Sequence, residues 1–169
     1  MPTTYEPLAT TTISSNTTSI TWSSISSAYT DLVIVASNVT STAAGGTIYL
    51  QFNNDTGSTY SITEMYGNGT SAASTRLSST TVIPINYFTT TGTTQTGQIS
   101  IAHIMNYSNT TTNKTVLARG NNASDASYPG AEAFVGLWRS TAAINRIDFS
   151  SNSKTWNAGT FTLYGIKAA

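Results

Sequence analysis

Apolar and polar residues alternate with a period of two along most of this sequence, and this pattern restricts the chain to β-structure. In the segment TIYLQF (47–52), Ile48, Leu50 and Phe52 share one side of an extended chain. The same alternation recurs in the segments 98–105, 145–149 and 160–166. No window of about 11 residues shows the 3.6-residue period of an amphipathic helix. The sequence therefore predicts an all-β fold.

Clusters of Gly, Asn, Ser and Pro divide the chain into short strands. The expected strands are 18–25, 31–37, 47–52, 60–66, 82–88, 98–105, 114–118, 133–138, 145–149 and 160–166. We expect them to form a jelly-roll-like two-sheet sandwich of about eight to ten antiparallel strands, with residues 1–169 as one domain. The uninterrupted apolar run in 31–37 predicts a central strand covered on both sides. Residues 1–18 are expected to be either an extended arm over a neighbouring molecule or a first edge strand.

Composition excludes several classes of function. Only 8% of the residues are charged and the net charge is zero, so we expect no nucleic acid partner. Ser and Thr supply 56 of the 169 residues, and 17 aromatic residues argue against disorder. Cysteine is absent, which removes disulfides and thiolate chemistry. No apolar run is long enough to span a membrane and the start lacks secretory features, so we expect assembly in a cytoplasm.

The tripeptide Asp55-Thr56-Gly57 matches the letters of an aspartic-protease site. That site needs two such loops, each after an apolar strand, whereas here the tripeptide occurs once and follows two asparagines. We therefore interpret residues 51–60 as a hairpin turn. Calcium binding by Asn53, Asn54 and Asp55 is a weaker alternative, because one carboxylate is little charge for a hard cation. No metal and no cofactor are expected.

Two further sets of titratable residues deserve a chemical interpretation. His103, the single histidine, is in phase with Ile99, Ile101 and Met105, which favours a core or interface residue over a catalytic base. Glu64 and Glu132 are the best available pair for glycoside hydrolysis, but their strand context suits solvated positions equally well. We expect no catalytic residue.

Aromatic residues offer one route to a binding site. Trp156 lies beside a turn and is expected to be exposed, and Tyr128 lies in the most turn-rich loop. If the protein contacts a glycan, Tyr128 and Trp156 are the residues expected to stack on it, although aromatics in a sandwich more often belong to the core.

Four segments together resemble small virion structural proteins of tailed bacteriophages, cyanophage-type phages among them. The segments are AYTDLVIVAS (28–37), GTIYLQFNNDTGSTYS (46–61), NKTVLARG (113–120) and GTFTLYGIKA (159–168). The Thr-rich segments 38–44 and 89–96 have no counterpart in that pattern.

The resemblance implies a non-enzymatic protein on the exterior of a phage particle, assembled in the host cytoplasm. Its expected role is that of a capsid decoration or cement protein bound to the major capsid protein or other virion proteins. A homo-oligomer is expected, and a trimer is one plausible arrangement. The alternative is a tail or fibre module that binds a host surface glycan or receptor.

Overall fold

The computed structural model describes residues 4–43, 46–87, 98–122, 130–152 and 154–167. These residues form twelve strands: β1 (Tyr5–Thr12), β2 (Ser19–Trp22), β3 (Asp31–Ser41), β4 (Thr47–Phe52), β5 (Tyr60–Gly67), β6 (Ala72–Thr80), β7 (Ile83–Tyr87), β8 (Ile99–Met105), β9 (Lys114–Asn122), β10 (Gly130–Trp138), β11 (Ile147–Ser151) and β12 (Trp156–Ile166). Within these ranges there is no helix, hence none that could cross a bilayer.

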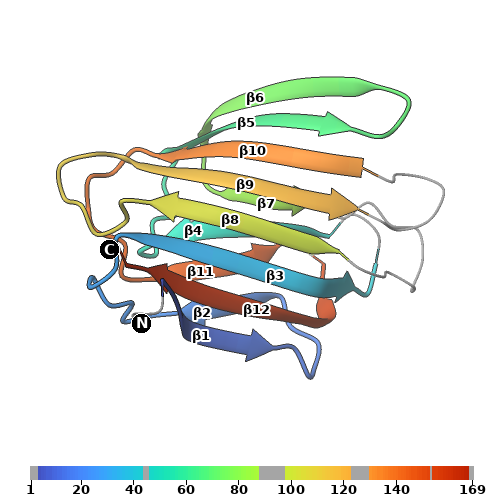
Figure 1. The fold of residues 1–169 in the computed structure, drawn as a ribbon. Coiled ribbons are helices and arrows are strands. Elements are labelled where there is room, and N and C mark those ends of the chain that lie inside the picture. Colours follow the sequence, from blue (N-terminus) through green and yellow to red (C-terminus); the bar gives the residue numbers. More distant parts are fainter. Residues whose placement is uncertain (1–3, 44–45, 88–97, 123–129, 153, 168–169) are drawn as a thin grey trace.

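The strands form two antiparallel sheets (Figure 1). The larger has the order β1-β12-β3-β8-β9-β10-β5-β6, and the smaller has the order β2-β11-β4-β7. The pairs β1–β12, β2–β11, β3–β8 and β4–β7 are nested and alternate between the sheets. Such nesting is what a long antiparallel ribbon gives when it is rolled into a double-sheet jelly roll. The predicted all-β, two-sheet sandwich is therefore confirmed.

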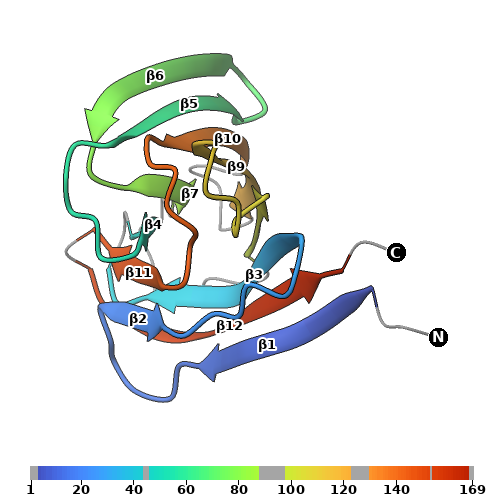
Figure 2. The same cartoon turned by 90° about the vertical axis from the view of Figure 1, so that its left-hand side faces the viewer.

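Two inserted hairpins enlarge one sheet of this jelly roll. The hairpin β5–β6 follows β4, and the hairpin β9–β10 follows β8. Both add to the larger sheet beyond β8, where β10 pairs with β5. Figure 2 shows the larger sheet curving from β1 to β6, with β7 packed beneath its extension. The larger sheet thus has a side that faces the smaller sheet and an opposite side that faces away.

The core lies between the sheets and is built from the alternating residues that the sequence pattern identified. Ile48, Leu50 and Phe52 of β4 are fully buried there. The run that predicted a central strand lies in β3, between β12 and β8, and Leu32 and Ile34 enter the core. Aromatic edges pack across the layers, as in the contact of Phe149 on β11 with Phe161 on β12 and that of Phe52 with Trp138.

The segment 51–60 contains a turn, but the prediction that it forms a hairpin is wrong. Strand β4 belongs to the smaller sheet and β5 to the larger one, so the segment crosses from one layer to the other. The Asp55 carboxylate holds this crossing in place. It accepts hydrogen bonds from the Gly57 N–H at 2.9 Å, the Thr59 hydroxyl at 2.8 Å and Trp138 Nε1 at 2.7 Å. The bond from Trp138, with those from Thr59 and Gly57, lowers the pKa of Asp55 despite its partial burial.

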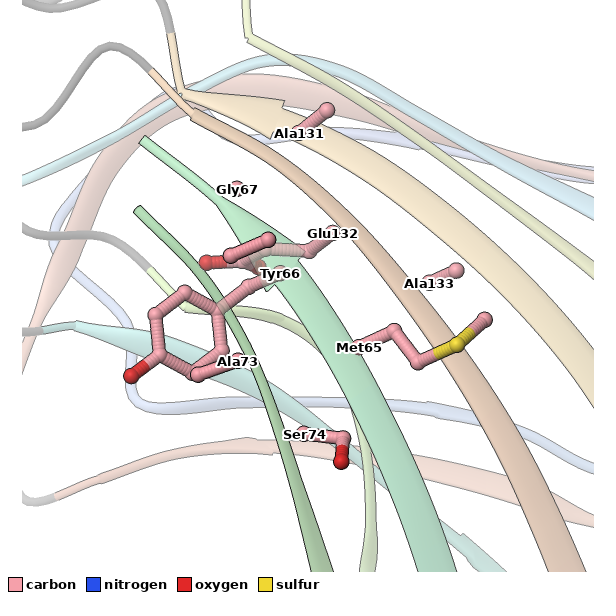
Figure 3. Close-up of a pocket in the computed structure, with 9 residues that line it drawn as sticks. Met65, Tyr66, Gly67, Ala73, Ser74, Ala131, Glu132 and Ala133 are labelled. Carbon is pink, nitrogen blue, oxygen red and sulfur yellow. The ribbon is translucent and has the colours of Figure 1, made fainter. Parts of the chain in front are cut away.

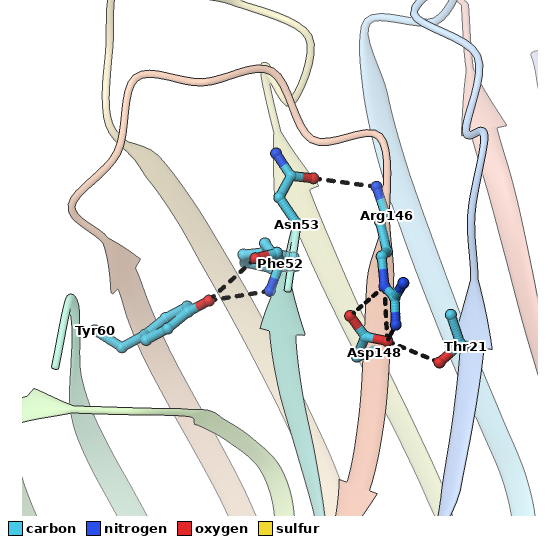
Figure 4. A network of polar contacts seen from close by, with 6 residues as sticks. All are labelled: Thr21, Phe52, Asn53, Tyr60, Arg146 and Asp148. Atoms are coloured by element: carbon cyan, nitrogen blue, oxygen red, sulfur yellow. Dashed lines mark hydrogen bonds and ion pairs between the residues drawn. The ribbon is translucent and has the colours of Figure 1, made fainter. Parts of the chain in front are cut away.

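Further polar contacts close the same end of the sandwich (Figure 4). The Tyr60 hydroxyl accepts a hydrogen bond from the Phe52 N–H at 3.0 Å, and Asn53 Oδ1 accepts one from the Arg146 N–H at 3.1 Å. Arg146 also pairs with Asp148 at 2.7 Å. Burial alone would raise the pKa of Asp148, but the hydrogen bonds from Arg146 and Thr21 lower it. Asp55 and Tyr60 therefore join the two layers, while Asn53, Arg146 and Asp148 tie together strands of the smaller sheet.

The N-terminal segment begins as an edge strand. Residues 5–12 form β1 and pair with β12, from Tyr5 opposite Ile166 to Thr12 opposite Thr160. The register shifts between Pro7 and Ala9. Within residues 4–12 this arrangement corresponds to the second of the two alternatives expected for the segment.

Candidate functional site: the outer face of the larger sheet

The side of the larger sheet that faces away from the smaller sheet carries an unusual number of apolar side chains. We call the mostly apolar central part of this side the outer face and define it by the residues Val33, Val35, Thr63, Met65, Ile99, Ile101, His103, Met105, Leu117, Arg119, Ala131, Ala133, Val135 and Leu137. Polar residues on the same side surround it, among them Ser37, Ser61, Thr115 and Thr162. Five of these are large apolar side chains with between 45% and 60% of their surface exposed: Met65, Ile99, Met105, Leu117 and Val135. The outer face is therefore an apolar surface without a cover in the described chain.

Strand β8 explains how this face arises. Its larger residues Ile99, Ile101 and Met105 lie on the outer face, whereas Ser100 and Ala102 are buried between the sheets. The sequence pattern grouped Ile99, Ile101 and Met105 as the core face of their strand, and for β8 this is wrong, because the residues between them enter the core. The inner side here is crowded by β7, where Asn86 Nδ2 donates to Ser100 Oγ at 2.7 Å. The contact with Asn86 leaves room for a small residue at position 100, whereas Ile104, further along the inner side of β8, is large and fully buried.

Glycines on the neighbouring strands show the same crowding. A Cβ atom added at Gly136 on β10 would lie 2.6 Å from Ile83 of β7. One added at Gly120 on β9 would lie 3.1 Å from the Asn86 side chain. The close approach of β7 therefore explains the small inner residues at these positions, while larger inner residues such as Phe134, which packs against Tyr87 of β7, lie beside them.

Cross-strand pairing arranges the outer face in rows. One row runs Val33, His103, Leu117, Val135 and Thr63 across five strands. Directly opposite residues in antiparallel strands have Cβ atoms about 5 Å apart, so the side chains of one row touch. His103 lies in this row, half-buried between apolar neighbours. The interpretation of His103 as an interface residue is thus compatible with its position, while a core position is not.

The next row contains the one charged residue near the middle of the face. It runs Ile101, Arg119, Ala133 and Met65. Arg119 is exposed and makes no ion pair or hydrogen bond within the described residues. A single unpaired guanidinium among apolar groups is suited to a partner that offers a carboxylate or another acceptor.

Shallow depressions mark the outer face. One of about 300 Å³ is lined by His103, Met105, Leu117 and Arg119, and one of about 330 Å³ by Ile99, Ile101 and Arg119. A third, of about 550 Å³, lies at the rim of the sheet, where β5 ends and β6 and β10 begin, and is lined by residues from both sides of the sheet (Figure 3). None of the three is a deep cleft of the kind that encloses a small substrate. They suit the side chains of a protein partner.

The third depression brings an aromatic ring and a carboxylate together. Tyr66 on β5 lies opposite Glu132 on β10. In Figure 3 both side chains point to the same side of the strands, while Met65 and Ala133 lie together on the other side. Glu132 Oε2 accepts a hydrogen bond from the Tyr87 N–H at 2.8 Å.

The structure places Glu64 and Glu132, the pair considered for hydrolysis, on neighbouring strands and on the inner side of the sheet. Glu64 lies opposite Phe134, two residues from Glu132, and is 7% exposed. Burial raises the pKa of both carboxyls, that of Glu132 to about 7, helped by the charge of Glu64. The expectation of solvated positions is thus wrong. The third depression is lined by Glu132 but not by Glu64, so it does not offer both carboxylates to one substrate.

Neither of the two aromatic residues expected to contact a glycan is found exposed in the described part of the chain. Tyr128 lies outside the described residues. Trp156 begins β12 and is fully buried, so the expected exposure is wrong. Its main chain exchanges hydrogen bonds with Thr17 at 2.8 and 3.0 Å, and its ring packs on Phe161 with the centroids 5.4 Å apart. Register shifts along β12 turn this residue inward although its sequence neighbours are polar.

Metal binding by the turn at Asn53 and Asp55 also lacks support from the geometry. The oxygen atoms of Asp55 and Asn53 are engaged in the hydrogen bonds described above. The described residues contain no group of three or more His, Asp or Glu side chains placed to hold a metal ion.

Comparison with known proteins adds no assignment. No family model, no curated protein and no solved structure matches the chain. The class of protein is therefore defined by geometry alone: a jelly-roll β-sandwich, enlarged by two hairpins, with an apolar outer face.

Proposed function

We propose that this chain is a non-enzymatic structural protein of a phage particle, a capsid decoration or cement protein that binds capsid subunits through its outer face. The exposed apolar outer face is the observation that carries the proposal. Large exposed apolar patches on small proteins mark protein contact sites. The choice of a phage capsid as the partner rests on the resemblance of the four strand segments to virion proteins.

The outer face is large enough to form the centre of a contact of ordinary size. Its five strands, about 4.8 Å apart and about seven residues long, give a flat area of roughly 600 Å². A stable protein contact buries about 800 Å² on each partner. The low charge of the face fits the centre of such a contact, where charged residues are depleted. Arg119 would then find an acceptor on the capsid subunit.

Cementing follows from binding by mass action. A protein that binds only the assembled shell stabilises the shell by RT ln(1 + [L]/Kd) at each site, about 2.7 kcal/mol when its concentration is 100 times Kd. Many sites on one particle add their contributions. No reacting group is needed for this function, only a rigid surface of the right shape.

The proposal is tested with particles that lack this protein. When the wild-type protein is added back, the temperature at which the particles release their DNA should rise. The added protein should also cosediment with the particles. Val135→Asp places a charge in the middle of the outer face without touching the core, and it should abolish both effects.

Ser19→Asp is the matched control, because Ser19 is exposed on β2 of the smaller sheet. This variant should bind as the wild type does. Unchanged DNA release on addition of the wild-type protein, or full binding by Val135→Asp, would overturn the proposal.

One observation favours the second candidate, a tail or fibre module that binds a host surface glycan. The exposed ring of Tyr66 next to the Glu132 carboxylate offers a stacking surface and a hydrogen-bond acceptor. Binding to a glycan array that is lost in Tyr66→Ala but retained in Val135→Asp would favour this candidate.

A further inference from the structure

Strand β6 is a long sheet edge that no other described segment covers. It ends the larger sheet, and residues 72–79 are exposed on both sides. The main-chain groups of these residues hydrogen-bond to β5, and no other described segment makes a backbone hydrogen bond to them. Leu77 remains 47% exposed at this edge. Unpaired N–H and C=O groups along such an edge are a template for another strand.

The other three sheet edges carry features that oppose strand addition. Strand β1 contains Pro7, which has no N–H, and a register shift. Strand β7 contains Pro84 and lies at a register shift in its pairing with β4. Strand β2 has only four residues. Strand β6 has nine residues and no proline, so it is the edge best suited to pairing.

The regular part of β6 spans residues 72–78. The turn at Asn68 precedes it, and Ser79, which has φ of +60° and lies in a register shift against β5, follows it. In an antiparallel pair of identical strands related by a two-fold axis, one residue lies opposite its own copy. Thr75 is the middle residue of the regular segment, so pairing about Thr75 uses all seven residues and none of the irregular ones.

Pairing about Thr75 also gives compatible neighbours. Ala73 lies opposite Leu77 of the other copy, and Ser74 lies opposite Arg76. Ala73 and Leu77 then form an apolar pair, and the two copies of Thr75 form a Thr–Thr pair. Both are favourable cross-strand pairs. Pairing about Arg76 would instead place two guanidinium groups directly opposite each other, which is unfavourable. Arg76, the one charge of β6, thus selects against the competing register.

We propose that two copies of this chain associate through β6, antiparallel and centred on Thr75, so that their larger sheets become one continuous sheet. About six to eight main-chain hydrogen bonds join the copies, and the exposed part of Leu77 is covered by Ala73 of the other copy. The guarded edge β1 prevents the head-to-tail pairing of β6 with β1 that would give a filament. A closed two-fold pair results, in place of the trimer considered from sequence.

This inference is independent of the proposed capsid contact, which uses the outer face. A pair joined at β6 presents two outer faces on the same side of one sheet, so two adjacent sites on a particle could be bound at once. Failure of the pairing would leave binding by single copies intact, and failure of capsid binding would leave the pair intact.

Single-cysteine crosslinking tests the register, because the chain has no thiol of its own. Opposite residues in an antiparallel pair have Cα atoms about 4.5 to 5.5 Å apart, within the range of a disulfide. Under mild oxidation Thr75→Cys should form a disulfide-linked dimer. Ser74→Cys alone should not, whereas a mixture of Ala73→Cys and Leu77→Cys chains, both of which keep Arg76, should give the mixed dimer.

Leu117→Cys, in the middle of the outer face, distinguishes this pairing from contact between two outer faces. Dimers linked efficiently through Cys at 117 but not at 75 would overturn the proposal. Sedimentation of the wild-type protein should give twice the 17.8 kDa of one chain. Thr75→Lys, which places two ammonium groups opposite each other at an exposed position, should sediment as a folded monomer. A wild-type monomer at all concentrations would equally overturn the proposal.

Discussion

Replacing Glu132 with Gln should remove most of the pH dependence of stability between about pH 4.5 and pH 7. Burial raises the pKa of the Glu132 carboxyl from 4.5 to about 7 in the folded chain. The folded protein therefore keeps the proton over a pH range in which the unfolded chain has lost it. Stability from this group is fully present below pH 4.5 and declines as the pH rises through about 7.

The magnitude follows from the pKa difference. At about 1.4 kcal/mol for each pH unit, the interval from 4.5 to about 7 corresponds to roughly 3 kcal/mol of unfolding free energy. Gln is neutral at every pH, has nearly the shape of Glu, and can accept the Tyr87 N–H through its carbonyl oxygen. The Gln variant should match the wild type near pH 4 and exceed its stability by up to about 3 kcal/mol at pH 8.

Urea denaturation at half-unit steps from pH 4 to pH 8 measures this difference. Glu6→Gln is the control, because Glu6 is an exposed carboxyl paired with Lys167 at 3.3 Å. This control should retain the wild-type slope between pH 5 and pH 8. Parallel profiles of wild type and Glu132→Gln would refute the assignment of the raised pKa to Glu132.

Two further predictions concern the joints between the layers. Asp55→Ala removes three hydrogen bonds to the carboxylate and leaves the Trp138 indole N–H without a partner. Urea denaturation should therefore show a loss of about 2 to 4 kcal/mol of unfolding free energy. Neither the wild type nor the variant should show proteolytic activity. Gly136→Ala places a Cβ 2.6 Å from Ile83 and should lower the melting temperature by several degrees, the equivalent of about 1 to 3 kcal/mol. Ile83→Ala, which removes every atom that the new Cβ would meet, should cost less in the Gly136→Ala chain than in the wild type. An unchanged melting temperature for Gly136→Ala would contradict the close approach of β7.

Alternation predicted several strands, because one face of each enters the core, and the uninterrupted apolar run in 31–37 predicted that β3 lies between two other strands. Strand β6 was not predicted, since residues 72–80 contain a single large apolar residue, Leu77, and no alternation. Its extended form depends on pairing with β5, which is a tertiary cause.

The candidate site was the part that sequence could not locate. A period of two shows which residues share a side of a strand, but not which side is inside. In β8 that choice depends on how β7 packs against its inner side, where Asn86 contacts Ser100. This contact joins two different strands, so the local sequence of β8 does not reveal it. The inward turn of Trp156 likewise depends on register shifts in β12 that leave no mark in local composition.

The pairing of β1 with β12 has a consequence for how the chain is made. Tyr5 finds its partner Ile166 only after roughly 160 further residues have been synthesised, which takes about 8 to 32 seconds at the usual rates of translation. During that time the edge of β3 that receives β12 is also open. Completion of the larger sheet is therefore expected to wait until β12 has been synthesised, and a chaperone that shields nascent apolar strands would raise the yield of this protein more than that of a chain built from local contacts.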